Sequence, residues 1–304
     1  MVDILLEIFY ILSGLVAFSA AYMAFKDDNH PKKIGTAMFW ILLGLTFMIG
    51  KYIPSEIVGI MILAMGGLTA FKQVAIGNQE NAPDEFRQRE SERIGNKIFL
   101  PALSMAVFAF LIAQFTTLGG LVGLGIGTVI SIIMTLAMTK ASPSYISYDG
   151  SRLLQQIGSS SILPQLLAAL GALFAVAGVG EVISTGISSV IPQGNILLGV
   201  IAYCLGMAIF TMIMGNAFAA FAVITAGIGI PFVYSQGANP AIVGTLALTA
   251  GYCGTLMTPM AANFNVVPAA ILETKNEKRV IISQIPFAIA MLLTHIALMY
   301  FWAF

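Results

Sequence analysis

The sequence predicts an all-α, polytopic integral membrane protein with about ten transmembrane segments. Of its 304 residues, 58% are hydrophobic and 9% are charged, and the mean hydropathy is +0.92. In a soluble domain, about a quarter of the residues are usually charged. Hydrophobic runs of about 20 residues recur along the chain, and this is the length that a helix needs to cross a bilayer. The 14 basic and 14 acidic residues balance, so no nucleic-acid partner is expected.

The hydrophobic runs give the expected position of each span. In the first half they cover residues 4–25, 34–50, 54–71, 98–116 and 118–139. In the second half an amphipathic lead-in, 151–161, precedes the runs 162–191, 196–214, 217–234, 240–272 and 280–301. The run 240–272 is too long for one straight helix. The first run lacks a basic N-terminal region, so we expect a retained span rather than a cleaved signal peptide.

Lysine and arginine concentrate in four loops, which predicts the orientation of the chain. These loops hold Lys26, Lys32, Lys33, Lys72, Arg87, Arg89, Arg93, Lys97, Lys140, Arg152, Lys275, Lys278 and Arg279. Because cytoplasmic loops are enriched in basic residues, both termini are expected outside and these four loops in the cytoplasm. The loop 72–97 mixes both charge signs and contains a predicted short helix, 84–93. We interpret it as a solvated cytoplasmic loop, with a docking surface for a partner as the alternative.

The composition changes near Ser142. Glycine, serine, threonine, asparagine and proline become frequent within the hydrophobic runs after this point. We therefore interpret residues 1–140 as scaffold helices and 141–304 as a transport half with broken helices or re-entrant hairpins. Broken helix at membrane depth is tolerated only where it is packed in protein or lines a cavity. Interrupted hydrophobic segments also point to the binding sites of transporters.

Gly215 and Asn216 stand where two hydrophobic runs meet with almost no linker. Either a tight turn joins two spans there, or a helix unwinds and restarts. In the second geometry the N-terminus of a half-helix points into the protein, and such ends attract anions. Both residues are therefore candidates for substrate binding.

A second segment concentrates polar residues around one proline. Pro259 cannot donate a hydrogen bond to the Thr255 carbonyl, and its ring clashes with that group, so the helix should break there. Thr255 and Thr258 offer oxygen atoms to a coupling cation, while Asn263 and Asn265 offer amides to the substrate. Four polar residues around one proline exceed what a structural kink needs, so we favour a functional role.

Three further residues are weaker candidates. Pro231 is expected to kink or end a helix and to free carbonyl groups near Thr225, whose hydroxyl is another candidate cation ligand. A proline kink without a function is, however, common in membrane helices. Glu181 is the one acidic residue in a long hydrophobic stretch. It either binds a coupling cation or proton, or lies near the interface and faces water or a partner.

We expect neither an enzyme nor a cofactor, apart from Na⁺ or H⁺ as the coupling ion. The sequence contains none of the common catalytic motifs. Only Glu181 and His295 could carry acid–base chemistry, and nothing in the sequence places them together. Cys204 and Cys253 lie in hydrophobic runs without disulfide or metal-binding spacing, which indicates small buried thiols.

Several of these motifs resemble the ion-transporter superfamily, which includes gluconate and C4-dicarboxylate permeases. Gly215-Asn-Ala, Thr225-Ala-Gly-Ile and Gly251-Tyr-Cys-Gly-Thr-Leu-Met-Thr-Pro259 are similar to its glycine-rich hairpins and broken helices. The segment 171–181 resembles its first hairpin. The resemblance covers roughly the second half of the chain. This chain is shorter than those permeases, and its first repeat is poor in polar residues.

Over its full length the chain resembles an uncharacterised bacterial membrane family, catalogued as a domain of unknown function. Its members are typically encoded beside a second, smaller membrane protein and often near a pyroglutamyl peptidase. The resemblance implies a two-subunit carrier for 5-oxoproline or a related carboxylate.

We therefore expect a secondary active transporter, or an essential subunit of a two-component one, for a small organic anion. Coupling to Na⁺ or H⁺ is expected because uptake of an anion against a negative-inside potential needs a driving cation. The alternative is a non-catalytic membrane subunit that stabilises a partner permease. Membrane lipid surrounds the chain in either case, and the sequence leaves a homo-oligomer open.

Overall fold

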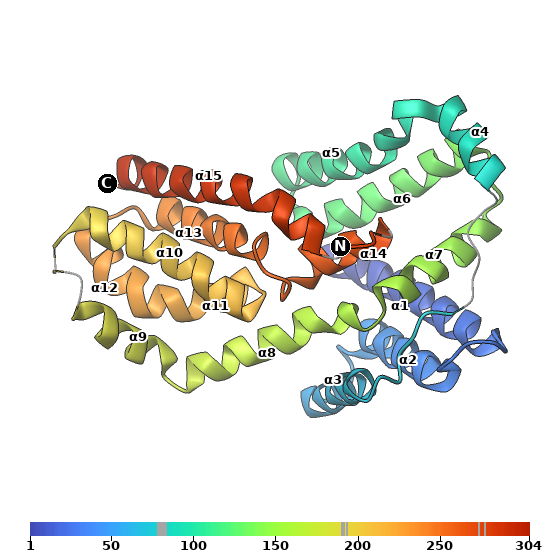
Figure 1. Cartoon of the computed structure of the whole chain (residues 1–304), viewed down its shortest axis with the longest axis horizontal. Coiled ribbons are helices and arrows are strands. Elements are labelled where there is room, and N and C mark those ends of the chain that lie inside the picture. The colour runs from blue at the N-terminus through green and yellow to red at the C-terminus, as the bar shows by residue number, and fades with distance from the viewer. Residues whose placement is uncertain (78–83, 190–191, 193, 273, 277) are drawn as a thin grey trace. The chain divides into compact units, whose positions relative to one another are not determined.

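The structure, a computed structural model, describes residues 1–77, 84–189, 192, 194–272, 274–276 and 278–304. Within these ranges the chain forms helices joined by turns and loops, and they contain no β-strand (Figure 1). The predicted all-α class is therefore confirmed. Residues 78–83 of the predicted loop 72–97 lie outside these ranges, and the short helix predicted in this loop is present as α4 (Asp84–Ile94).

Six described helices are long and hydrophobic enough to cross a membrane, judged by length and composition. They are Val2–Lys26, Glu85–Phe115, Gly119–Thr139, Ile196–Met214, Ala217–Gln236 and Lys278–Trp302. A seventh is added if Ser144–Ile157 and Ser160–Val176 are counted together as one span. These helices support a multi-pass membrane protein, but the predicted number of about ten spans is not confirmed.

Several hydrophobic runs form helices shorter than a full span. α2 (Lys33–Ile49) has 17 residues, and α3 (Ser55–Ala70) and α13 (Pro240–Thr255) have 16 each. At 1.5 Å per residue such helices are about 25 Å long, which is less than the roughly 30 Å hydrocarbon core of a bilayer. Hydrophobicity alone does not show where a helix stops, which is why the runs outnumber the helices of spanning length.

The chain divides into two compact units, Met1–Gly158 and Ser159–Phe304. The sequence placed the boundary between scaffold and transport half after residue 140. The amphipathic helix α7 (Ser144–Ile157) therefore belongs to the first unit, where it lies along α1 (Val2–Lys26). The different roles assigned to the two halves stay a prediction.

Small residues hold the helices of the first unit at short distances. The unit also contains α5 (Leu100–Phe115) and α6 (Gly119–Thr139). α1 and α2 approach at Gly14, where a Cβ atom would lie 2.9 Å from the carbonyl oxygen of Gly44. α5 and α6 approach at Gly127, where a Cβ would lie 2.7 Å from the carbonyl oxygen of Met105. Small residues at such contacts let helices in membranes pack closely.

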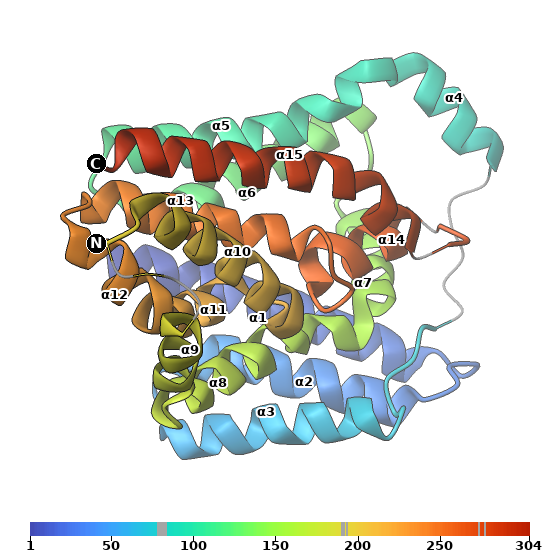
Figure 2. The same cartoon turned by 60° about the vertical axis from the view of Figure 1, so that its left-hand side comes forward.

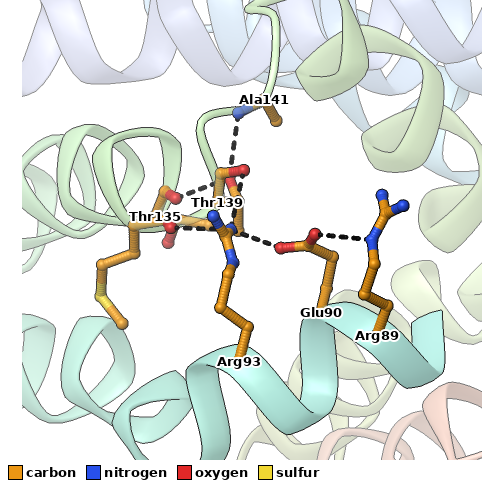
Figure 3. Close-up of polar contacts among 7 residues, drawn as sticks. Arg89, Glu90, Arg93, Thr135, Thr139 and Ala141 are labelled. Carbon is orange, nitrogen blue, oxygen red and sulfur yellow. Dashed lines mark hydrogen bonds and ion pairs between the residues drawn. The ribbon is translucent and has the colours of Figure 1, made fainter. Parts of the chain in front are cut away.

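The end of α6 is capped by a side chain of α4. Arg93 Nη2 donates hydrogen bonds to the carbonyl oxygens of Met138 and Thr139, at 3.3 Å each, and forms an ion pair with Glu90 (Figure 3). Arg89 lies on the other side of Glu90, with 3.5 Å between Nε and Oε1. The last carbonyl groups of a helix lack partners within it and carry the negative end of its dipole. The Arg93 guanidinium therefore stabilises this helix end and fixes α4 on it.

The second unit gathers around one central helix, α10. Its helices are α8 (Leu163–Val176), α9 (Val179–Ser188), α10 (Ile196–Met214), α11 (Ala217–Ile224), α12 (Ile230–Phe232), α13, α14 (Val267–Ile271) and α15 (Lys278–Trp302). A π-helical segment follows α11, and another precedes α14. Figure 2 shows α10, α13 and α15 lying side by side. The buried core between them includes Tyr203, Cys204, Met207, Ala250, Cys253 and Met299.

Main-chain contacts set the spacing of this core. A Cβ at Gly254 would clash with the carbonyl oxygen of Ala208, so α13 touches the backbone of α10 there. At the other end of α13, the N–H of Asn239 donates to the carbonyl oxygen of Ala303 at 2.8 Å. The beginning of α13 thereby meets the residue that follows α15, and these two helices run antiparallel.

The run predicted over 162–191 is interrupted at Gly178. α8 ends at Val176, Gly178 has a φ of 72°, and α9 begins at Val179. This positive φ is readily adopted only by glycine, so the helix is interrupted at a residue suited to it. The last two residues of the run lie outside the described ranges.

α8 and α9 pack in turn on α11 and on the π-helical segment that follows it. Gly171 packs on Ala219, and Gly180 packs on the backbone of Gly227. The residue numbers therefore rise in the same direction along both packed segments. α9 packs mainly on the π-helical segment that follows α11 and makes few contacts with α8, so the chain does not fold back on itself at the interruption. The hairpin suggested by resemblance for residues 171–181 is not formed.

The close approach of α13 to α10 predicts the effect of a single methyl group. We expect Gly254→Ala to destabilise the detergent-solubilised protein by roughly 1–3 kcal/mol, because the new Cβ would clash with a main-chain carbonyl. Gly244→Ala in the same helix is the control, since its Cβ would lie 3.5 Å from the Tyr234 hydroxyl, an ordinary contact. Thermal unfolding measures both variants. Equal melting temperatures would contradict the close packing.

The cap on α6 predicts a local change in dynamics. Arg93→Ala should release α4 from the end of α6, so hydrogen–deuterium exchange should rise in residues 84–94. Arg89→Ala is the control, because Arg89 contacts Glu90 and Phe86 within α4 itself. Exchange in that variant should stay close to the wild type. The same exchange in both variants would show that Arg93 does not anchor the helix.

Candidate functional site

Gly215 and Asn216 form a tight turn between α10 and α11. Gly215 ends α10 with a φ of 68°, the left-handed conformation that favours glycine. Asn216 then caps α11, because its Oδ1 accepts hydrogen bonds from the N–H groups of Phe218, at 2.9 Å, and Ala219, at 3.3 Å. Of the two geometries that the sequence left open, the structure has the tight turn. The Nδ2 group of Asn216 has no hydrogen-bond partner in the described part of the chain.

A helix break follows α13. The helix stops at Thr255, and a π-helical segment begins at Ala262. Pro259 lies in the loop between them, so the helix ends before the proline instead of continuing with a kink. In this loop the carbonyl oxygen of Met260 lies against Gly215, where any side chain would clash with it. The loop therefore packs directly on the α10–α11 turn.

Asn265 and Thr258 hold this loop, and we call these two side chains the loop clamp. Asn265, which is 1% exposed, donates hydrogen bonds from Nδ2 to the carbonyl oxygens of Thr255 and Thr258 at 2.7 Å each. The Thr258 hydroxyl donates to the carbonyl oxygen of Met212 in α10 at 2.8 Å and accepts from the Met260 N–H at 3.2 Å. A helix break frees polar main-chain groups that are costly to bury unpaired. The loop clamp satisfies several of them.

A pocket of about 320 Å³ lies beside the loop clamp. It is lined by Leu167, Gly215, Asn216, Ala217, Phe218, Tyr252, Thr255, Met260, Ala262, Asn263 and Phe264. Three of these residues form an aromatic wall, because the Tyr252 ring lies 6.1 Å from the Phe218 ring and 5.9 Å from the Phe264 ring, measured between centroids. None of the lining residues is charged.

Four of the predicted site residues meet in this pocket. Gly215, Asn216 and Asn263 were candidates for the substrate, and Thr255 for the coupling ion. The Asn263 side chain is exposed and has no hydrogen-bond partner among the described residues, whereas the Thr255 hydroxyl donates to the Tyr252 carbonyl at 2.6 Å. The pocket thus offers two unpaired amides, those of Asn216 and Asn263. Asn265, a fourth substrate candidate, does not line it.

Thr225 and Pro231 lie elsewhere in the unit. Thr225 begins a π-helical segment, in which its carbonyl oxygen accepts the N–H of Ile230. Its hydroxyl hydrogen-bonds with that of Tyr203 in α10 at 2.6 Å. Pro231 follows this wide turn in α12. Such π-helical turns are frequent at functional sites, but neither residue lines the pocket, so Thr225 does not join Thr255 and Thr258.

The ionisable candidates also stay apart from the pocket. Glu181 is exposed in the first turn of α9. His295 is buried in α15, and its Nδ1 lies 2.7 Å from the carbonyl oxygen of Met291 one turn earlier. The described residues contain no group of three or more His, Cys, Asp or Glu side chains that could hold a metal ion. The pocket can therefore bind a ligand through hydrogen bonds and ring contacts, and its lining contains no carboxylate, histidine, lysine or arginine.

The sequence did not identify the aromatic wall. Phe218, Tyr252 and Phe264 come from α11, α13 and the π-helical segment before α14. Phenylalanine and tyrosine are common throughout this hydrophobic chain, so residue type does not distinguish these three. The one available signal is position, because Phe218 and Phe264 closely follow the asparagines that line the same pocket.

A comparison with protein families matches residues 7–304 to the family described as "Protein of unknown function (DUF979)". The chain belongs to this family. The match covers almost the whole chain, including both units, and agrees with the expected membership of an uncharacterised family. Comparisons with curated proteins and with solved structures found no match. The similarity to permeases, expected from the motifs, and the neighbouring genes, expected from the full-length resemblance, remain expectations.

Two asparagines of the break should respond differently to the same substitution. Asn265→Ala removes two buried hydrogen bonds to carbonyl groups, and we expect a loss of about 1–3 kcal/mol in stability. Asn263→Ala, two residues earlier, removes an exposed side chain and should leave the melting temperature unchanged. Thermal unfolding of both variants in detergent is the measurement. A stable Asn265→Ala variant would contradict the clamping role.

Proposed function

We propose that this protein is a secondary active transporter, or an essential subunit of a two-component one, for a small organic anion. The observation that carries the proposal is the pocket beside the break of α13, which is built from a turn, a loop and unpaired amides in a hydrophobic chain. Irregular backbone at membrane depth is stable where it lines a cavity. Interrupted helices of this kind hold the substrate sites of known transporter folds.

The pocket suits a small molecule such as 5-oxoproline or a related carboxylate. Its volume of about 320 Å³ falls in the usual range of small-molecule sites. The amides of Asn216 and Asn263 are available to donate to carboxylate or carbonyl oxygens, and the aromatic wall can pack against a small ring. No lysine or arginine lines the pocket, so the charge of an anion needs compensation from a bound cation.

Coupling to Na⁺ or H⁺ follows from the charge of the substrate. An anion entering a cell with a negative-inside potential moves uphill and needs a driving cation. The distribution of basic loops favours both termini outside, and the family resemblance favours a bacterial plasma membrane. A second membrane protein, implied by the family resemblance, would pack on this chain. α2 and α3, which are short for a span and expose hydrophobic side chains, are surfaces suited to it.

Uptake into proteoliposomes tests the proposal. Labelled 5-oxoproline is offered to vesicles with this protein, with the membrane protein encoded beside it, or with both, under an inward Na⁺ or H⁺ gradient. Uptake that requires this protein and a gradient supports the proposal. Uptake by the partner alone would make this chain a stabilising subunit. If no combination of folded proteins transports 5-oxoproline or other small carboxylates, the proposal is rejected.

Substitutions at the two amides test the site itself. Asn263→Ala should reduce uptake at least tenfold, because a hydrogen bond to a charged group contributes about 1.5–3 kcal/mol and 1.4 kcal/mol is a factor of ten. Asn216→Ser should do the same, since serine keeps the helix cap but lacks Nδ2. The matched control is Asn239→Ser, at an asparagine that caps α13 through the same two contacts. Equal uptake by Asn216→Ser and Asn239→Ser would remove Asn216 from the site.

A further inference from the structure

A second pocket, of about 340 Å³, lies in the first unit, between the beginning of α1 and the end of α2. The two helices lie side by side (Figure 1). They are antiparallel, because Glu7 Oε2 lies 3.9 Å from Lys51 Nζ and, one turn further into both helices, the Tyr10 ring stacks on the Phe47 ring with 6.4 Å between centroids. Both helices and the turn after α2 therefore form the walls of this pocket.

The lining of the pocket combines charged groups with hydrophobic surface. Its charged side chains are Asp3 and Glu7, near the beginning of α1, and Lys51, in the turn after α2. Its hydrophobic surface comes from Leu6, Tyr10, Phe47 and Met48. Because α1 is long enough to cross a membrane, the charged residues at its beginning are expected at the membrane surface and the later turns in the hydrocarbon. The pocket therefore matches a ligand with a polar head and a hydrophobic tail.

The three charged side chains leave one carboxylate without a counter-ion. Lys51 lies near Glu7, and its Nζ is also 5.9 Å from the centroid of the Tyr52 ring, which lines the pocket too. Asp3 makes no hydrogen bond or ion pair in the described part of the chain. The lining thus carries one excess negative charge, next to an ammonium group whose side chain is 68% exposed and free to turn. Such a lining favours a ligand with a positive group and a second, negative group.

We propose that this pocket binds one phospholipid whose headgroup carries a primary ammonium, as in phosphatidylethanolamine. The ammonium would donate hydrogen bonds to the carboxylates of Asp3 and Glu7, and Lys51 would pair with the phosphate. An acyl chain would pack along Tyr10 and Phe47, between the two helices. One molecule then satisfies all three charges and covers the hydrophobic wall.

The carboxylates determine which headgroup fits. A primary ammonium has three N–H donors for carboxylate oxygens, whereas the trimethylammonium group of phosphatidylcholine has none. Phosphatidylglycerol has no positive group, so its phosphate would meet the excess negative charge of Asp3. The lining therefore ranks phosphatidylethanolamine above both other lipids.

A lipid at this position would stabilise the α1–α2 pair at its open end. The residues between α1 (Val2–Lys26) and α2 (Lys33–Ile49) connect the helices at the opposite end. At the pocket, the described contacts between the two helices include an exposed ion pair and one ring pair, and exposed ion pairs contribute little to stability. Binding of this lipid does not depend on the proposed transport function, because the site lies wholly within the first unit.

Thermal unfolding of the full-length protein in detergent micelles with added lipid tests the site. Phosphatidylethanolamine, phosphatidylcholine and phosphatidylglycerol with identical acyl chains are compared at the same mole fractions. A ligand that binds the folded state raises the melting temperature in proportion to its affinity and concentration. Phosphatidylethanolamine should give the largest rise. Soluble glycerophosphoethanolamine, which has the headgroup without the tails, should give none.

Substitutions at Asp3 separate binding from folding. Asp3→Asn removes a carboxylate that has no partner in the described chain, so without lipid the melting temperature should equal that of the wild type. The affinity for phosphatidylethanolamine should fall about fivefold, the upper value for a part-exposed ion pair. Asp3→Lys should reverse the preference, so that phosphatidylglycerol gives the largest rise. Glu56→Gln is the matched control, because Glu56 is an exposed carboxylate in the first turn of α3 that does not line the pocket.

Four outcomes overturn the proposal. The first is a wild type that responds equally to the three lipids, and the second is an Asp3→Lys variant that still prefers phosphatidylethanolamine. The third is a full rise with glycerophosphoethanolamine alone, which would make the ligand a free zwitterion. The fourth is an Asp3→Asn variant that is already destabilised without lipid, which would give Asp3 a structural role.

Discussion

The hydrogen bonds from Asn265 to the carbonyl oxygens of Thr255 and Thr258 are the interaction on which the second unit depends. In a hydrophobic environment each freed main-chain group needs a partner from within the protein. By binding two carbonyl groups at once, one amide allows α13 to stop inside the unit. The loop that follows then reaches the α10–α11 turn, where Gly215 leaves room for its backbone. The pocket exists because the helix is broken and the break is stable.

Polar residues close together at the break differ in whether their side chains bind the main chain or remain unpaired. Asn265 and Thr258 are buried and bound to main-chain groups, whereas Asn263 is exposed at the pocket with its amide unpaired. Asn216 combines both tasks, because its oxygen caps α11 while its nitrogen remains available. Residue type therefore does not separate the amides that bind the main chain from those that remain unpaired. The separation comes from burial and from which atoms of the amide are already bound.

The sequence predicted where helices end better than it predicted which residues lie close together in the fold. Proline and glycine act locally, so the break near Pro259 and the junction at Gly215 could be located from the chain alone. Thr225 and Glu181 were grouped with the break because all of them are polar residues in hydrophobic runs. The structure pairs Thr225 with Tyr203 and leaves Glu181 exposed, since their positions depend on the packing of separate elements. The aromatic wall was missed for the same reason: its three rings come from three segments and meet only after folding.

The segments 173–180 and 221–229 are similar in sequence, each ending in a Gly-x-Gly, and they also touch in the structure. A Cβ at Gly180 would lie 3.2 Å from the carbonyl oxygen of Val223, and one at Gly227 would lie 2.6 Å from the carbonyl oxygen of Gly180. The atom nearest to each added Cβ is a main-chain carbonyl oxygen, which no substitution can shorten. A larger residue at either glycine therefore has no second-site suppressor at the other, which is already as small as a residue can be. Genetic screens for compensating changes would return nothing at this contact, although it is one of the closest in the unit.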